Sequence, residues 1–135
     1  MTEEETKRAA QKIRAGDTIA RDILVKAKAV LQQGWTGGDA AEARDADGKI
    51  VPAMAASATE WTPLGAIKRA STQYAMAGWS LAASWLRLTI TQPPYSFLDL
   101  YAWNNAEGQT LESILTAFDD AITRLDQKYT EEPLS

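Results

Sequence analysis

Apolar residues recur along this chain with the period of about 3.6 residues that is typical of amphipathic α-helices. The clearest pattern predicts a last helix that follows Thr110, a residue suited to cap it. Its apolar stripe consists of Leu111, Ile114, Leu115, Phe118, Ala121, Ile122 and Leu125. A second strong pattern predicts a helix that starts after Asp17 as its N-cap. We expect this helix to end at Gly34 in the left-handed conformation that glycine allows.

The first residues of the chain have a weaker pattern. Thr2 and Glu5 have the spacing of a capping box, which favours a helix start. The apolar face behind them contains only two alanines and Ile13. We therefore expect residues 1–16 to form a separate and loosely packed helix.

The segment from Tyr74 to Ile90 is apolar on nearly all sides of a helix. A helix of this kind is normally surrounded by other elements. We therefore predict that it is the central helix of the domain, with Trp79 and Trp85 in the core. Pro93-Pro94 ends it, because proline cannot continue the hydrogen-bond ladder.

The remaining segments predict shorter elements. Residues 64–70 resume a helical pattern, with Pro63 in the first turn. Residues 42–51 suit a short β-hairpin around a turn at Asp47-Gly48. Ser96 would cap a short helical turn, and residues 103–109 read as a tight loop.

These patterns predict a single domain over residues 1–135 of mainly α class. It is a compact helical domain around a central apolar helix, with a helical core over 17–129 and a frayed tail at 130–135. The length fits one domain of ordinary size. Apolar residues make up 45% of the sequence and charged residues 24%, which is the composition of a globular protein.

The composition excludes several kinds of chemistry, because the chain has no cysteine and no histidine. It cannot form a disulfide, a thiol nucleophile or a cysteine-ligated metal site. It also lacks the usual general base and the commonest metal ligand. Asp45-x-Asp47-Gly48 resembles the start of a calcium loop, but Ala56 stands where the bidentate carboxylate belongs. We therefore expect no metal, no cofactor and no catalytic residues.

Charge and hydropathy further narrow the expected partners. Residues 1–33 carry seven basic and five acidic side chains, and the rest carries seven basic and thirteen acidic ones. This pattern indicates solvated helix faces rather than a nucleic-acid surface. We do not expect the acidic start to be a secretory signal, and residues 74–90 are too few for a membrane span and include Arg87. We expect a cytoplasmic protein.

Three of the five tryptophans, Trp35, Trp61 and Trp103, stand in predicted loops. Large rings at such places commonly fill gaps between helix ends. Alternatively, they converge on an apolar pocket or on a contact surface for a partner. Asn104 and Asn105 would then supply polar contacts. These five residues are the candidate binding site.

Four short patterns resemble a family of small bacterial and bacteriophage proteins catalogued as a domain of unknown function. They are Leu31-x-x-Gly34-Trp35-Thr36, Gly65-Ala66-Ile67-x-Arg69-Ala70, Trp103-Asn104-Asn105-x-x-Gly108-x-Thr110 and Phe118-Asp119-x-Ala121-Ile122. The family often has Asp at the position of Asn105 and Cys at the position of Thr62. The resemblance implies a helical domain of bacterial or phage origin and brings no activity with it.

Three functions are consistent with the sequence. The first is a non-catalytic binding module of the cytosol that recognises a protein or a small ligand. The second is a phage or mobile-element inhibitor of a host system. The third is a small-molecule-binding enzyme that uses carboxylates such as Glu60 and Asp119. The sequence leaves the oligomeric state open.

Overall fold

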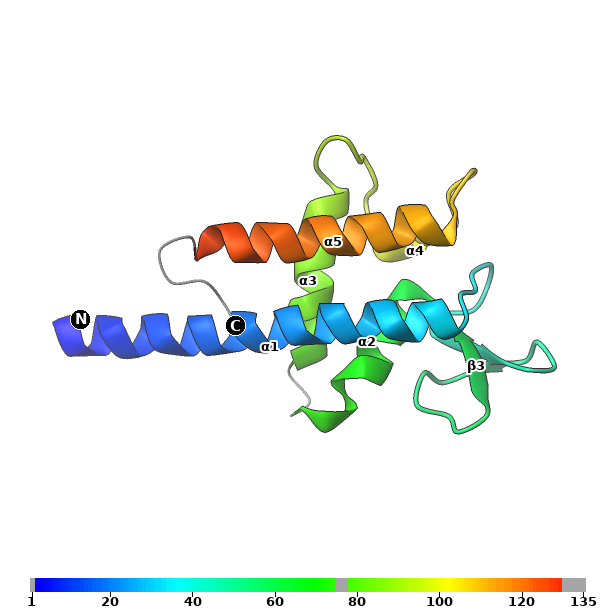
Figure 1. Ribbon diagram of the computed structural model, residues 1–135, viewed down its shortest axis with the longest axis horizontal. Coiled ribbons are helices and arrows are strands. Elements are labelled where there is room, and N and C mark those ends of the chain that lie inside the picture. The colour runs from blue at the N-terminus through cyan, green and yellow to red at the C-terminus, as the bar shows by residue number, and fades with distance from the viewer. Residues whose placement is uncertain (1, 75–77, 130–135) are drawn as a thin grey trace.

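The computed structural model describes residues 2–74 and 78–129 of the chain (Figure 1). In these residues, five α-helices and a small three-stranded antiparallel sheet make up the fold. The predicted mainly helical class is therefore confirmed. None of the described helices is long and apolar enough to cross a membrane. The predicted frayed tail, residues 130–135, lies outside the described residues.

Helix α1 (Glu3–Gln33) is one continuous helix and not the two that we predicted. Gly16 and Asp17 resemble a helix end followed by a cap, but both are helical. A glycine inside a helix costs only about 1 kcal/mol, which the packing of the rest of α1 can outweigh. The side chain of Asp17 is buried and bonds groups far along the chain, so it does not cap a helix.

Helix α1 also occupies the central place that we predicted for the segment around Trp79 and Trp85. It packs against α2 (Pro63–Ala70), α3 (Gly78–Ile90) and α5 (Leu111–Lys128). Helix α3 buries one face, and Leu88 on another face is 44% exposed. Both tryptophans are half-buried, because α3 crosses the outside of α1 and α5 (Figure 1).

The predicted hairpin is present and belongs to a larger sheet. Strands β1 (Ala43–Asp45) and β2 (Ile50–Val51) pair antiparallel around the turn at Gly48, whose φ is +82°. A third strand, β3 (Ala58–Trp61), pairs with the other edge of β1. We did not predict β3, because its few residues show no alternating pattern. It provides the third strand that lets a small sheet persist.

Gly34 ends α1 as predicted, but in an extended conformation, with φ at 178°. The prediction of a left-handed conformation at Gly34 was therefore wrong. A side chain at this position would place its Cβ 2.2 Å from the carbonyl oxygen of Thr59. Glycine is needed because the chain passes directly beside β3, where the amide of Trp61 donates to the Gly34 carbonyl.

The last two helices are present as predicted, but the first of them has a different N-cap. Thr110 caps α5 and shares a capping box with Ser113. Asp99, and not Ser96, caps α4 (Leu100–Asn104) by accepting from the amide of Ala102 at 2.7 Å. The predicted loop therefore starts later, and Trp103 stands in a helix.

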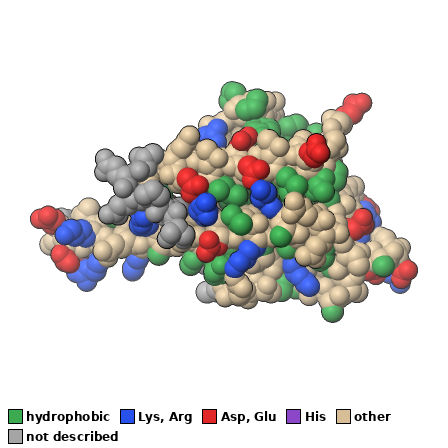
Figure 2. Space-filling model, in the orientation of Figure 1, with side chains coloured by type: hydrophobic (Ala, Val, Ile, Leu, Met, Phe, Trp, Pro, Cys, Tyr) green, Lys and Arg blue, Asp and Glu red, His purple; other side chains and the backbone are tan. Residues whose placement is uncertain are grey.

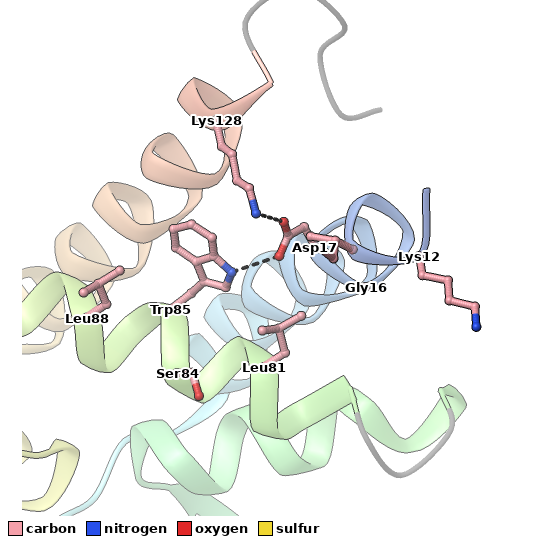
Figure 3. A pocket seen from close by; sticks show the side chains of 9 residues that line it. Lys12, Gly16, Asp17, Leu81, Ser84, Trp85, Leu88 and Lys128 are labelled. Atoms are coloured by element: carbon pink, nitrogen blue, oxygen red, sulfur yellow. Dashed lines mark hydrogen bonds and ion pairs between the residues drawn. The ribbon is translucent and has the colours of Figure 1, made fainter. Parts of the chain in front are cut away.

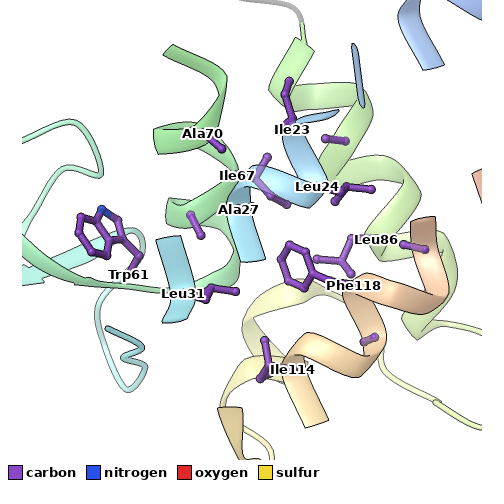
Figure 4. Packing of buried hydrophobic residues seen from close by; sticks show 14 of the residues in the cluster. Ile23, Leu24, Ala27, Leu31, Trp61, Ile67, Ala70, Leu86, Ile114 and Phe118 are labelled. Atoms are coloured by element: carbon purple, nitrogen blue, oxygen red, sulfur yellow. The ribbon is translucent and has the colours of Figure 1, made fainter. Parts of the chain in front are cut away.

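The core lies where α1, α2, α3 and α5 meet (Figure 4). Phe118 of α5 is fully buried together with Leu24 of α1 and Leu86 of α3. Full burial of a side chain of this size stabilises a fold by roughly 1.5–3 kcal/mol. The core holds the helices in place and leaves the first turns of α1 outside it (Figure 1).

Candidate functional site

The structure brings three of the five candidate residues together. The indole nitrogen of Trp35 donates to Asn104 Oδ1 at 2.7 Å, and Asn104 Nδ2 donates to the carbonyl of Thr36 at 3.0 Å. Asn105 Oδ1 accepts from the amide of Gly38 at 2.8 Å, and its Nδ2 donates to the Gly38 carbonyl. Both amide side chains therefore tie the loop after α1 to the end of α4.

The other two candidates are buried and face elsewhere. Trp61 is 4% exposed, and its indole nitrogen donates to the carbonyl of Ala53 at 3.1 Å. Trp103 is 1% exposed and packs against Phe118, with ring centroids 6.5 Å apart. These two rings fill the core, as large rings between the ends of helices commonly do.

Trp35 is half-buried and lines a hollow of about 310 Å³, which we call the Trp35 hollow. Its other walls include Gly37, both asparagines and Gln109. Of the three loop tryptophans, only Trp35 borders it. Since the asparagine side chains already bond the loop backbone, their role as ligand contacts stays a prediction.

A second hollow, of about 420 Å³, lies between α1 and α3 (Figure 3). We call it the α1–α3 hollow. Its lining residues are Lys12, Ile13, Gly16, Asp17, Leu81, Ser84, Trp85, Leu88 and Lys128. It forms because α1 continues past the point where α3 crosses it, which leaves an open angle between the helices. None of its lining residues was a candidate from sequence.

Asp17 stands at one side of this hollow and is 2% exposed. Its Oδ1 accepts from the indole nitrogen of Trp85 at 3.1 Å (Figure 3). Its Oδ2 accepts from Lys128 Nζ at 2.8 Å and from the hydroxyl of Tyr129 at 2.6 Å. Three partners therefore compensate the loss of water around this carboxylate.

The pKa of Asp17 shows that these partners outweigh burial. Burial alone raises the pKa of a carboxyl group, but the bonds from Lys128, Tyr129 and Trp85 hold that of Asp17 below its ordinary value of 3.8. The hydrogen bond between Lys128 and Asp17 in turn raises the pKa of Lys128. Asp17 is thus a weak base with occupied oxygens, which suits a structural anchor better than a proton acceptor.

We expect this anchor to contribute to acid sensitivity. The folded-state pKa lies below 3.8, so the stabilisation is complete above that pH and is lost as the pH falls through the folded value. The free energy of unfolding, measured by urea titration between about pH 6 and pH 2, should fall more steeply for the native protein than for Asp17→Asn. A constant difference between the two proteins over this range would contradict the assignment.

Gly16 forms part of the hollow because it has no side chain. A Cβ built at this position would lie 3.4 Å from Leu81 Cδ2, an ordinary contact distance, and the backbone is helical. We therefore expect Gly16→Ala to raise the free energy of unfolding by about 0.5–1 kcal/mol, as glycine-to-alanine changes do inside helices. Urea unfolding measures this change, and a loss of stability would show that the space is already filled.

The carboxylates named for an enzyme are not assembled into either hollow. Asp119 forms an ion pair with Lys28, and Glu60 stands on β3. Neither residue lines the Trp35 hollow or the α1–α3 hollow. Among the described residues, no group of three acidic side chains is placed to hold a metal ion.

Comparison with known proteins gives a family and no activity. The model of a family of unknown function, DUF6197, matches residues 15–124. The match includes the Trp35 hollow and most walls of the α1–α3 hollow, but not the first turns of α1. Neither the curated proteins nor the solved structures contain a match to the chain.

Proposed function

The chain belongs to the DUF6197 family, and we propose that it is a non-catalytic binding module of the bacterial or phage cytosol. Its contact site in this proposal is the α1–α3 hollow. The observation that carries the proposal is an open apolar recess beside a carboxylate whose bonds are already satisfied. Such a recess can hold an apolar group and offers no free base to act on it.

The apolar walls of the hollow support this proposal. Ile13 is 56% exposed and Leu88 is 44% exposed, and both belong to the hollow. Leu81 and Trp85, which also line the hollow, are half-buried. Small-molecule sites commonly have volumes of about 300–1,000 Å³ and apolar walls with few polar groups, so the size and lining fit a small ligand or one side chain of a partner.

The charges around the hollow favour an occupant with a negative group. Lys12 and Lys128 are basic, and Asp17 is the one acidic residue in its lining. Asp17 is already paired with Lys128, so Lys12 at the rim leaves an excess of positive charge (Figure 3). The occupant that fits best has an apolar body and an anionic group.

Anilinonaphthalene sulfonate is a suitable probe, because it combines aromatic rings with an anionic sulfonate and reports binding by fluorescence. We expect saturable binding to the native protein. Gly16→Leu places a side chain in the hollow, and leucine favours a helix. It should weaken binding at least about tenfold, because the space for the probe is filled.

Two controls separate this effect from unfolding. Leu98→Ala removes an apolar side chain that is 88% exposed and does not line the hollow, so it should leave binding unchanged. The thermal unfolding midpoint of Gly16→Leu must be no lower than that of the native protein, since leucine at a helical glycine should raise it. Unaltered binding in a folded Gly16→Leu variant would overturn the proposed site.

A further inference from the structure

The first turns of α1 project beyond the rest of the protein (Figure 1). The side chains of residues 3–13 are all exposed, and α1 has its first buried side chain at Asp17. We call residues 3–14 the projecting segment. Twelve helical residues extend about 18 Å at about 1.5 Å per residue, which is enough for a second helix to pack along them.

The face of α1 that packs on the protein continues into residues 3–13, whose side chains are exposed. Ala20 and Leu24 are fully buried on this face. Helical spacing places Thr6, Ala10 and Ile13 on the same side of the helix. Ile13 is 56% exposed, so an apolar stripe with small neighbouring side chains faces solvent.

Charged residues on the sides of this stripe are arranged to match a second copy of the same segment. Glu5 and Lys12 are seven residues apart and therefore lie on one flank of the helix. Acidic residues fill the first turn, at Glu3, Glu4 and Glu5, whereas Lys12 lies near the other end. Figure 2 shows charges of both signs gathered at this end of the molecule.

We propose that the projecting segments of two copies pack antiparallel and form a weak dimer. A two-fold axis brings the same flank of both helices together. Each Glu5 then faces Lys12 of the second copy, and the two apolar stripes meet near Ala9 and Ala10. A parallel arrangement would instead bring the acidic first turns of both copies side by side.

The interface is small, so the dimer forms and dissociates readily. Stable interfaces generally bury about 1,200–2,000 Å² in total, and twelve residues of each helix cover less than that. The proposal predicts self-association at concentrations from about 0.1 to 1 mM, which sedimentation equilibrium can follow. Lys12 and Ile13 also line the α1–α3 hollow, so self-association is measured without a ligand.

Complementary charge variants test the arrangement. Glu5→Lys or Lys12→Glu alone replaces both attractive pairs with repulsive ones. An exposed ion pair contributes about 0.2–1 kcal/mol. Because each variant turns two such attractions into repulsions, it should raise the dimer dissociation constant about tenfold. An equimolar mixture of the two variants should dimerise again, since opposite charges then face each other in the mixed pair.

Glu4→Lys is the matched control, because it makes the same charge change in the first turn. Position 4 lies on the side of α1 opposite to the stripe, so dimer formation should stay as in the native protein. A native protein that remains monomeric at about 1 mM would overturn the proposal. Equal dimerisation of all three variants, or no recovery in the mixture, would also overturn it.

Discussion

Gly65→Ala is expected to destabilise the protein by at least about 3 kcal/mol, the range of severe steric changes. A Cβ at this position would lie 1.8 Å from the carbonyl oxygen of Glu42 and 2.6 Å from its carbonyl carbon. Both atoms are backbone, so no side-chain rotation relieves the contact. Helix α2 or the backbone at Glu42, just before β1, would have to move.

The surrounding hydrogen bonds oppose that movement. The amide of Thr62 donates to the Glu42 carbonyl at 2.9 Å, and the Thr62 hydroxyl donates to the carbonyl of Ala41 at 2.8 Å. Thr62 also caps α2 by accepting from the amide of Gly65. A shift of α2 would therefore break the bonds that start the helix.

Urea unfolding of Gly65→Ala checks this expectation, with Gly16→Ala as the matched change in another helix. The two substitutions are chemically identical, and we expect opposite signs. A Gly65→Ala protein as stable as the native one would mean that α2 does not approach the Glu42 backbone so closely.

Asp17→Ala is expected to lower the free energy of unfolding by about 2–3 kcal/mol, because it leaves several polar groups without their partner. The indole nitrogen of Trp85 and the hydroxyl of Tyr129 both lose their acceptor. Lys128 loses its ion pair, but its side chain is 43% exposed and regains water. Because Lys128 regains water, the loss of stability is smaller than for a fully buried ion pair.

Asp17→Asn distinguishes the charge from the shape of this side chain. It keeps one acceptor oxygen and about the same volume, so we expect a smaller loss than for alanine. Thermal and urea unfolding of both variants measure the difference. Equal stability of Asp17→Ala and the native protein would show that α5 does not depend on this anchor.

Local patterns predicted the elements whose signals lie within a few residues. The apolar stripe of α5 and its Thr110 cap are examples, as are Pro63 at the start of α2 and the turn at Gly48. In each case, neighbouring residues decide the conformation. These elements are therefore readable from one sequence.

Tertiary contacts decided the features that we missed. Gly16-Asp17 has the local signature of a helix boundary, yet the ion-pair partner of Asp17 is Lys128, 111 residues away. One clue was present: Asp17 continues the stripe of Ala20 and Leu24, which indicates a buried carboxylate. The identity of its partners cannot be read from the sequence, because they are distant from Asp17 along the chain.

Contacts between distant residues also decide how the five candidate site residues are arranged. The structure joins Trp35 to Asn104 across 69 residues, whereas Trp61 and Trp103 are buried and do not border the Trp35 hollow. Their use as a binding surface stays a prediction. The α1–α3 hollow depends on where α3 crosses α1, which no spacing along the chain specifies.

The most direct test of the α1–α3 hollow is an NMR titration of the native protein with anilinonaphthalene sulfonate. The chain has five tryptophans. The indole N–H signal of Trp85 reports on the α1–α3 hollow, and that of Trp35 reports on the Trp35 hollow. We predict that the signals of Gly16, Leu81 and the Trp85 indole shift most. Shifts centred on the Trp35 indole and Asn105, with Trp85 unchanged, would contradict the proposed site.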